Sequence, residues 1–284
     1  MATAKRTVLI TGCSDGGMGA ELAKGFHKAG SHVYATARDP AKMANLSALG
    51  IQTLPLDIQS ESSIAECVKQ LDHLDILINN AGATYTMPIS DVSIAEAKKL
   101  FDTNVWGNIS MIQAFLPLLL KSPKGMIVNH TSVGAGMAIP FQATYNASKA
   151  AMAMFSDSLR LELQPFDINV VNLKTGGVKT NIVNNLRTKQ HSLPEGSIYR
   201  PAKDLMDKQL RSEWTDNVGI PAEQWAKDVV ADLLKANPPL NIWRGESAGT
   251  ARIGSVLPYG ALDGMLGRMM GLDKIDKAIR EHWK

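Results

Sequence analysis

A tyrosine and a lysine at positions i and i+4 carry the clearest chemical signal in this sequence, within Tyr145-Asn146-Ala147-Ser148-Lys149. Residues with this spacing share one face of a helix, so Tyr145 and Lys149 are expected to point into the same cleft. A free phenol has a pKa of about 10 and is a poor acid or base at neutral pH. A nearby ammonium lowers that pKa by stabilising the phenolate. Together with Ser132 upstream and a glycine-rich turn near the amino terminus, the pair predicts an active site.

The glycine-rich turn, Thr11-Gly12-Cys13-Ser14-Asp15-Gly16-Gly17-Met18-Gly19, follows the first expected strand and opens the first expected helix. Glycines allow the backbone to turn sharply and to approach a pyrophosphate closely, and the helix amino terminus adds free N–H groups and a favourable dipole. At the start of an alternating pattern of strands and helices, such a turn indicates a dinucleotide site. The residues of the turn predicted to contact the cofactor are Gly12, Ser14, Asp15, Gly17, Met18 and Gly19.

The end of the second expected strand, Tyr34–Asp39, indicates which dinucleotide is bound. An acidic residue at this position would hold the ribose hydroxyls of NAD and repel a 2′-phosphate. Ala37 stands there instead, and Arg38 follows it with a guanidinium suited to bidentate phosphate binding. The sequence therefore favours NADP(H), with the alternative that Arg38 merely pairs with Asp39 on the surface.

Asp57 and Ile58, at the end of the third expected strand, are further candidates for cofactor contact. The Asp57 carboxylate is placed to accept a hydrogen bond from the adenine amino group. The alternative role is structural, since an aspartate at this point is also suited to cap the helix that is expected to begin near Ser60.

Composition and charge narrow the class of protein. The 284 residues are 45% hydrophobic and 20% charged, as in an ordinary globular protein, and the net charge of +3 is too small and too dispersed to indicate nucleic-acid binding. Two cysteines and six histidines without ligand spacing predict no metal site and fit a reducing compartment. The first residues lead directly into a strand, and the longest apolar run, Ala114–Leu120, is too short to span a bilayer. We therefore expect an intracellular, cytoplasmic protein.

Short apolar runs alternate with amphipathic stretches of helical length, which is typical of parallel strands joined by crossover helices. No linker divides the chain, so we expect one doubly wound α/β domain of the Rossmann type over residues 1–284, with a parallel sheet of about seven strands flanked by helices. The expected strands are Thr7–Ile10, His32–Thr36, Gln52–Leu56, Asp75–Asn79, Gly125–Asn129, Ile168–Leu173 and Leu240–Arg244. The expected helices are Gly17–Lys28, Ser60–Leu71, Ser93–Leu120 (with a bend or an end at Pro117), Ala143–Gln164 and Pro221–Lys235.

The stretch from Lys174 to Gly219 departs from this alternation and is polar, with several glycines and prolines. A long insertion after the carboxyl end of a strand usually covers a ligand site, so we interpret residues 174–219 as a substrate lid. The alternative is an ordinary surface excursion. The neighbouring stretch Val133–Thr144 is rich in apolar side chains and indicates an apolar or lipid-like substrate. Basic residues that could bind a phosphate group near it are Lys174, Lys179, Arg187 and Lys189.

Taken together, these residues resemble the classical short-chain dehydrogenase/reductases, and the resemblance runs through most of the chain. The family signatures in order are the glycine turn Thr11–Gly19, the segment Asn79-Asn80-Ala81-Gly82, Asn104 within Asp102–Gly107, and Ser132 with Tyr145 and Lys149. The resemblance implies that Asn80, Ala81 and Gly82 stabilise the sheet and line the adenosine pocket. It also implies that Asn104 holds a water in a proton relay, and that the catalytic residues are Asn104, Ser132, Tyr145 and Lys149.

Two departures from the family pattern bear on the cofactor site. The glycine turn has one residue more than usual, so Gly17 and Gly19 are expected to take the roles of the last two family glycines. After the sixth strand, Thr175-Gly176 stands where the family usually has Pro-Gly. The resemblance implies that Val178 and Thr180 contact the nicotinamide beyond this turn.

The sequence of the glycine turn, together with Leu193–Ser197 and a methionine-rich tail, resembles the sequences of a narrower group, the fungal 1-acyldihydroxyacetone-phosphate reductase-like proteins. This resemblance implies NADPH-dependent reduction of a ketone, or the reverse oxidation of an alcohol, on an apolar or lipid-like substrate such as acyl-glycerone phosphate. In that reaction Ser132 would position the carbonyl oxygen, Tyr145 would donate the proton and Lys149 would bind the nicotinamide ribose. The alternatives are a fungal ketoreductase that tailors secondary metabolites, and an NADP-binding sensor without turnover.

The carboxyl-terminal extension, at about residues 245–284, contains the methionine-rich segment Ile253–Leu272. We expect this segment to pack on the core or on a subunit neighbour, or to line the substrate pocket, because flexible methionines suit apolar pockets. The alternative is peripheral contact with a membrane, at the endoplasmic reticulum or a lipid droplet. The resemblance also implies a homodimer or homotetramer, in which the two long helices Ser93–Leu120 and Ala143–Gln164 pack against their symmetry mates.

Overall fold

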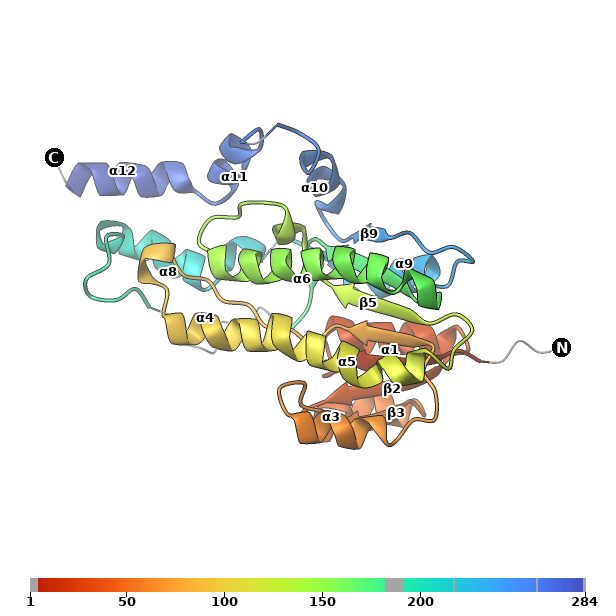
Figure 1. Cartoon of the computed structure of the whole chain (residues 1–284). Coiled ribbons are helices and arrows are strands. Elements are labelled where there is room, and N and C mark those ends of the chain that lie inside the picture. The colour runs from red at the N-terminus through yellow and green to blue at the C-terminus, as the bar shows by residue number, and fades with distance from the viewer. Residues whose placement is uncertain (1–4, 182–191, 217, 259, 283–284) are drawn as a thin grey trace.

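Seven parallel strands form the central sheet of the computed structural model, which describes residues 5–181, 192–216, 218–258 and 260–282 (Figure 1). The strands lie in the order β3-β2-β1-β4-β5-β6-β9, and this order reverses between β1 and β4. Their bounds are β1 Thr7–Thr11, β2 His32–Ala37, β3 Gln52–Pro55, β4 Ile76–Asn79, β5 Met126–His130, β6 Asn169–Thr175 and β9 Asn241–Arg244. Doubly wound sheets bind ligands outside the carboxyl ends of their strands at such a reversal. The expected Rossmann-type fold is confirmed.

Helices cover both faces of the sheet (Figure 1). One face carries α1 (Met18–Lys28), α2 (Ala44–Ala48) and α9 (Ala222–Leu233), and the other carries α3 (Glu61–Val68), α5 (Gly107–Leu119) and α6 (Ala143–Glu162). The apolar faces of these helices bury two separate clusters against the sheet, one around Phe26 and the other around Phe115. Because both faces are covered, β1 and β4 are buried at each position, which explains the apolar runs Val8–Ile10 and Ile76–Ile78 within them.

The helix expected over Ser93–Leu120 is interrupted, but not at Pro117. A first segment, α4 (Ile94–Phe101), passes into a π-helical turn at Asp102–Trp106, and α5 then continues beyond the proline. Such a turn accommodates one extra residue, and here it directs Asn104 into the interior, where its side chain is fully buried. The helix therefore becomes irregular where a buried polar side chain needs partners rather than where proline removes an N–H group.

The insertion after β6 is folded rather than a surface loop. Its two ends pair with each other as a small parallel sheet of β7 (Val178–Lys179) and β8 (Ile220–Pro221). Between them lies α8 (Lys203–Leu210), while residues 182–191 are outside the described ranges. Short 3-10 turns occur at Pro40–Met43, Ile89–Asp91, Val133–Ala135, Gln164–Phe166, Arg200–Ala202 and Glu213–Thr215.

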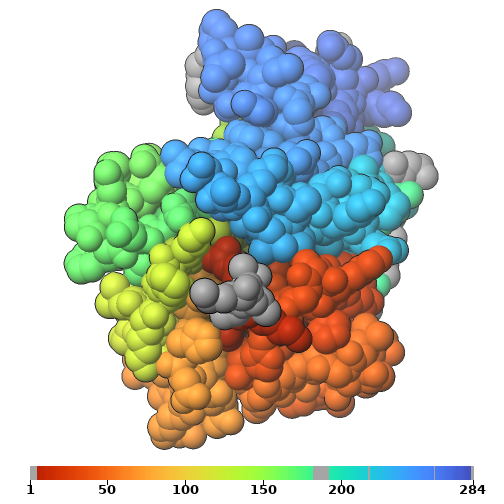
Figure 2. Space-filling view, turned by 90° about the vertical axis from the view of Figure 1, so that its right-hand side faces the viewer, coloured from red at the N-terminus to blue at the C-terminus, as the bar shows by residue number. Residues whose placement is uncertain are grey.

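Three short helices form the carboxyl-terminal extension. They are α10 (Ala248–Gly254), α11 (Asp263–Met269) and α12 (Leu272–His282). Figure 2 shows this extension, in dark blue, gathered at one end of the molecule. Met270 and Ile275 of the extension are buried together with Met206 of α8, so the extension packs on the lid.

The methionine-rich part of the extension has both buried and exposed apolar side chains. Leu266 and Met270 are buried, whereas Ile253, Val256 and Leu257 are exposed. Within the described ranges, none of the helices is sufficiently long and apolar to cross a bilayer. Peripheral contact between residues 253–272 and a membrane stays a prediction.

Candidate active site

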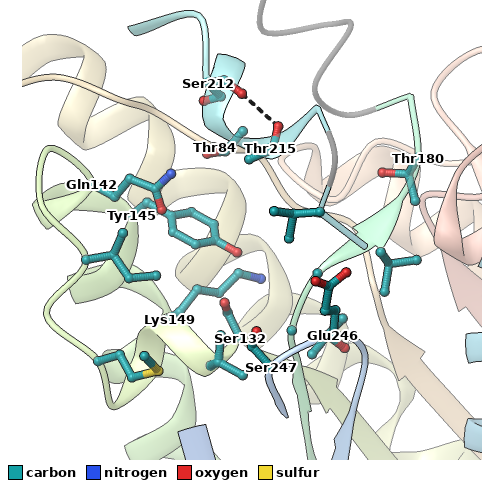
Figure 3. A pocket seen from close by; sticks show the side chains of 18 of the residues that line it. Thr84, Ser132, Gln142, Tyr145, Lys149, Thr180, Ser212, Thr215, Glu246 and Ser247 are labelled. Carbon is teal, nitrogen blue, oxygen red and sulfur yellow. Dashed lines mark hydrogen bonds between the residues drawn. The ribbon is translucent and has the colours of Figure 1, made fainter. Parts of the chain in front are cut away.

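A cavity of about 590 Å³ opens at the carboxyl ends of the central strands, between α6, the lid and the carboxyl-terminal extension. Three of the predicted catalytic side chains line it. Figure 3 shows Tyr145 and Lys149 from α6 pointing toward Ser132, which follows β5. The helical spacing thus brings Tyr145 and Lys149 to one wall of the cavity, as the sequence predicts, and Ser132 reaches the same wall from the end of β5.

Ser132 lies beside the Tyr145 phenol at the end of β5. The Ser132 hydroxyl oxygen accepts from the Gly134 backbone N–H at 3.0 Å and caps the 3-10 turn that begins there. This bond uses a lone pair of the hydroxyl and leaves its hydrogen for another acceptor. The Lys149 Nζ lies 5.9 Å from the centroid of the Tyr145 ring.

The pKa of Tyr145 shifts in the direction opposite to the one predicted from Lys149. Burial raises the pKa of the phenol above its ordinary value, and the hydrogen bond from Ser132 lowers it by less. Desolvation disfavours a phenolate, and here it outweighs the favourable contacts. Tyr145 therefore holds its proton at neutral pH, and in this closed environment the phenol is a weaker acid than free tyrosine.

Lys149 is buried and lies on the wall of the cavity. Its Nζ donates a hydrogen bond to the backbone carbonyl of His130 at 2.9 Å. A side chain on Gly82 would begin 3.4 Å from this Nζ, so the glycine leaves room for the ammonium. Burial lowers the pKa of Lys149 to about 8, so the ammonium loses its proton only slightly above neutral pH.

The depressed pKa of Lys149 predicts a characteristic dependence of stability on pH. Between pH 8 and the ordinary lysine value of 10.5, the unfolded chain holds a proton on Lys149 that the folded chain has released. The free energy of unfolding should therefore rise with pH across this window, by about 3 kcal/mol relative to a Lys149→Met variant. Urea unfolding of both proteins at several pH values measures the difference, and a flat difference would contradict a lowered pKa.

Both polar atoms of the Asn104 side chain form hydrogen bonds within the protein. Its amide donates to the Ala83 carbonyl and to the Ser148 hydroxyl, each at 3.0 Å, and its side-chain oxygen accepts from the Ala83 N–H at 2.8 Å. Its backbone carbonyl also accepts from the Asn108 side-chain amide at 2.9 Å. The sequence analysis missed Asn108. The water relay at Asn104 stays a prediction.

The glycine turn adopts backbone conformations that require glycine. Gly12 and Gly16 have φ of +73° and +76°, in the left-handed region. A Cβ on Gly19 would lie 2.5 Å from the Gly12 carbonyl oxygen, so the turn and α1 are in close contact there. Gly17 caps α1 without a side-chain hydrogen bond, which leaves the N–H groups of the first helical turn to a ligand. This arrangement fits a pyrophosphate.

The other expected contacts of the turn have different surroundings. The Asp15 carboxylate accepts from the backbone N–H of Asn45 at 3.2 Å and so ties the turn to the segment after β2. The Ser14 carbonyl accepts from the Gly17 N–H at 3.0 Å, within the turn itself. Met18 lines the cavity.

Asn80 joins β4 to the glycine turn. Its amide donates to the carbonyls of Thr11 at 2.7 Å and Gly12 at 3.2 Å. The backbone N–H groups of Asn80 and Ala81 donate to the Thr11 hydroxyl at 3.0 and 2.9 Å. These four bonds hold the turn at the point where the strand order reverses.

Arg38 is exposed at the carboxyl end of β2, beyond Ala37. Asp39 does not pair with it, because the Asp39 carboxylate accepts from the Ala41 N–H at 3.0 Å and caps the following 3-10 turn. Among the residues that the structure describes, Arg38 has no ion-pair partner. Its guanidinium is therefore accessible to a phosphate group.

The choice between two roles for Asp57 is partly resolved. Ser60, not Asp57, caps α3 by accepting from the Ser63 N–H at 3.3 Å. The Asp57 carboxylate instead accepts from the Gln59 N–H at 3.0 Å in a local turn and keeps its second oxygen for a ligand. Ile58 is buried, so any contact it makes with a cofactor is through its backbone or the edge of its side chain.

The turn after β6 is in close contact with the segment after β9. Gly177 and Glu246 exchange two backbone hydrogen bonds of 2.9 Å each, and the Glu246 carboxylate accepts from the Gly219 N–H at 2.5 Å. A Cβ on Gly176 would lie 2.1 Å from the Glu246 carbonyl oxygen. The segment after β9 thus crosses directly over this turn and leaves no room for a side chain. Val178 follows, on the cavity wall.

The remaining walls of the cavity are mainly apolar. Their apolar side chains are Met18, Val133, Met137, Ile139, Trp214, Val218, Met265, Leu266 and Met269, and Thr180 lies among them. The charged residues among the described lining are Lys149, Lys179, Asp216 and Glu246. Lys174 lies over the Trp243 ring, 4.8 Å from its centroid, and Arg187 and Lys189 are outside the described residues.

Several residues of this site escaped the sequence analysis. His130, Gln142 and Glu246 line the cavity, and Figure 3 shows Gln142 beside Tyr145. Ser212 Oγ and Trp214 Nε1 are buried on the lid without a hydrogen-bond partner among the described residues. The position of His130 at the end of an expected strand was a usable signal. The positions of Ser212 and Trp214 depend on the folding of the lid and had no local signal.

Comparison with known proteins places these features in one family. The family model described as short chain dehydrogenase matches residues 6–191. A short-chain dehydrogenase/reductase from Pestalotiopsis microspora is 51% identical over 281 residues, covering 99% of both chains. An NADPH-dependent 1-acyldihydroxyacetone phosphate reductase from Schizosaccharomyces pombe is 38% identical over 272 residues, covering 90% of both chains.

Solved structures agree with the fold. A short-chain dehydrogenase from Streptomyces avermitilis superposes with a TM-score of 0.76 at 24% identity, over 98% of this chain and 99% of that one. A short-chain dehydrogenase from Burkholderia cenocepacia, solved in complex with NADP, gives a TM-score of 0.73 at 25% identity, over 92% of this chain and 97% of that one.

Proposed function

The chain belongs to the short-chain dehydrogenase/reductase family of oxidoreductases, and from this premise we propose that it reduces a ketone to a secondary alcohol with NADPH, or runs the reverse reaction. The observation that carries the proposal is the convergence of Ser132, Tyr145 and Lys149 on one wall of the cavity, with the Lys149 Nζ 5.9 Å from the centroid of the Tyr145 ring. A phenol placed there can deliver a proton to a developing alkoxide, and its phenolate can take the proton back in the reverse reaction.

Each catalytic residue has one task in this reaction. When bound, NADPH supplies the hydride for the carbonyl carbon. The Ser132 hydroxyl donates a hydrogen bond to the carbonyl oxygen and positions it, and Tyr145 gives that oxygen its proton. Lys149 holds the nicotinamide ribose and, as a cation, stabilises the phenolate left on Tyr145. A water at the Asn104 carbonyl would return a proton to Tyr145 through Lys149.

The lining of the cavity supports an apolar, uncharged ketone. Its methionines adapt to bulky apolar groups, and the two lysines of the described lining, Lys149 and Lys179, are balanced by the two acids Asp216 and Glu246, so the lining has no excess of positive charge for a phosphate dianion. The Schizosaccharomyces pombe relative, named for an acylated phosphate, supports acyl-glycerone phosphate as the second candidate.

Cofactor consumption at 340 nm tests the proposal. The purified protein is assayed with NADPH and with NADH against acyl-glycerone phosphate and against uncharged polycyclic ketones. Turnover of the polycyclic ketones with NADPH would support a tailoring reductase, whereas turnover of the phosphorylated lipid alone would assign the protein to glycerolipid chemistry. Tight NADPH binding without turnover of any ketone would favour a sensor.

The exposed Arg38 predicts the preference for NADPH. An Arg38→Leu variant removes a charge-assisted hydrogen bond to the 2′-phosphate and should weaken NADPH binding by about tenfold or more, while NADH binding is unchanged. Dissociation constants from cofactor fluorescence measure both effects in one protein. Equal weakening of the two cofactors would mean that Arg38 does not read the 2′-phosphate.

Self-association is the second part of the proposal. Trp106 and Phe155 form an edge-to-face pair with ring centroids 6.2 Å apart, although the side chains are 53% and 40% exposed. Met154, beside them on α6, is 66% exposed. Apolar side chains gathered on the two long helices are typical of a subunit contact, in keeping with the dimer or tetramer that the family resemblance implies.

A charge placed in this surface should dissociate the subunits. A Phe155→Lys variant is expected to halve the molar mass measured by light scattering during gel filtration, because a buried lysine without a partner opposes association. The matched control is Leu49→Lys, since Leu49 is 54% exposed at the end of α2, away from these helices. An unchanged mass for Phe155→Lys would place the subunit contact elsewhere.

A further inference from the structure

His130, the last residue of β5, is a buried imidazole that the proposed mechanism does not use. Its side chain is 6% exposed, and both ring nitrogens have hydrogen-bond partners. Nδ1 lies 2.9 Å from the side-chain oxygen of Asn80, and Nε2 lies 2.7 Å from the hydroxyl of Thr175. Its partners therefore come from β4 on one side and from the end of β6 on the other.

The surroundings of Asn80 fix the tautomer of this ring. The Asn80 amide nitrogen donates to the carbonyls of Thr11 and Gly12, so the Asn80 oxygen must be the atom that faces His130. An amide oxygen accepts hydrogen bonds and cannot donate them, so Nδ1 of His130 carries the proton. Nε2 is then an acceptor, and the Thr175 hydroxyl donates to it.

The ring is neutral and cannot rotate. Burial, followed by the nearby Lys149 cation, lowers the pKa of His130 to about 3. The other groups that face the ring, Asn80, Thr175 and Trp225, carry no charge. The imidazole stacks on the fully buried Trp225 of α9, with ring centroids 5.3 Å apart and an interplanar angle of 22°.

We propose that His130 is a positioning residue that sets the distance between the two halves of the cofactor site. A chain of hydrogen bonds runs from Gly12 through Asn80 and His130 to Thr175. It links the glycine turn after β1 to the turn after β6 across the carboxyl ends of β4 and β5. The proposal rests on the proposed function in taking these two turns as the pyrophosphate and nicotinamide sides of one cofactor.

Variants of Thr175 test the proposal most directly, because the Thr175 hydroxyl is the last group in this chain of hydrogen bonds. A Thr175→Val change keeps the shape and leaves Nε2 without a donor, so NADPH binding should weaken by about tenfold, while Thr175→Ser keeps the hydroxyl and should retain the affinity. Dissociation constants of the folded proteins are compared with their unfolding temperatures. A Thr175→Val protein that unfolds earlier but binds NADPH as tightly as the wild type would overturn the proposal.

A His130→Leu change supplies the test of coupling. If the hydrogen bonds act as a unit, adding Thr175→Val to His130→Leu should cause no further loss of NADPH affinity, whereas additive losses would overturn the proposal.

Nitrogen NMR of labelled histidine gives a readout that needs no cofactor. The His130 ring should carry its proton on Nδ1 alone from about pH 5 to about pH 9. A ring that titrates in this range, or that carries its proton on Nε2, would contradict the proposal even if the proposed ketone reduction held.

Discussion

A Tyr145→Phe variant is expected to lose about 1,000-fold in kcat/KM for ketone reduction while it still binds NADPH. A positioned general acid contributes about 10²–10⁴-fold to the rate, and phenylalanine removes the acidic proton but keeps the ring. The ring contact with Lys149 and the packing of α6 should therefore survive. Initial rates at saturating NADPH, together with cofactor fluorescence, measure the two properties separately.

The matched control is Tyr199→Phe. Tyr199 is half-buried and packs edge-to-face against Phe141, with ring centroids 5.7 Å apart, and it is not among the residues that line the cavity. Its loss of a hydroxyl should leave the rate unchanged. Wild-type turnover in Tyr145→Phe would remove Tyr145 from its assigned role, and a parallel loss of NADPH binding would point to a damaged fold instead.

A Gly176→Ala variant is expected to lose both stability and cofactor binding. The new Cβ would stand 2.1 Å from the carbonyl oxygen of Glu246 and 3.1 Å from the backbone nitrogen of Ala248. Both neighbours are backbone atoms, so the segment after β9 would have to move as a whole. Overpacking of this kind should cost about 3 kcal/mol of unfolding free energy. Calorimetric unfolding and the NADPH dissociation constant measure the two losses.

Gly249→Ala is the control for this change. It adds the same methyl group within α10, three residues after Glu246, where no atom of another segment lies within 4 Å of the new Cβ. Alanine is the better helix former, so the control should be as stable as the wild type or slightly more stable. Equal behaviour of the two variants would mean that the segment after β9 does not pack on the turn as described.

The sheet could be predicted because its strands are buried on both faces. Runs such as Ile76–Asn79 and Met126–His130 are short, apolar and separated by amphipathic helices, and that pattern alone indicates parallel strands. The carboxyl-terminal extension was harder to predict. Its helices α10 and α11 are each seven residues long, which is too short for their own sequence to stabilise them, so they depend on packing against the rest of the protein.

Tyr145 and Lys149 could be predicted from their spacing in the sequence, but the direction in which the pKa of Tyr145 shifts could not. Tyr145 and Lys149 meet because one helix carries both, which is a local property. Whether the phenol gains or loses acidity depends on how much water reaches it, and this is set by distant segments that close the cavity. His130 shows the same limit. Its strand-end position was visible in the sequence, while its partners Asn80 and Thr175 lie on other strands.

The π turn at Asp102–Trp106 has a consequence for how this chain can vary. Compared with a straight α-helix, it contains one surplus residue, and a residue inserted in a helix advances the phase of everything after it by about 100°. Deleting a residue there would turn Asn104 away from Ala83 and at the same time swing Trp106 away from Phe155. The interior of the cavity and the outward aromatic pair thus share one helical phase, so an insertion or deletion at this point alters both together.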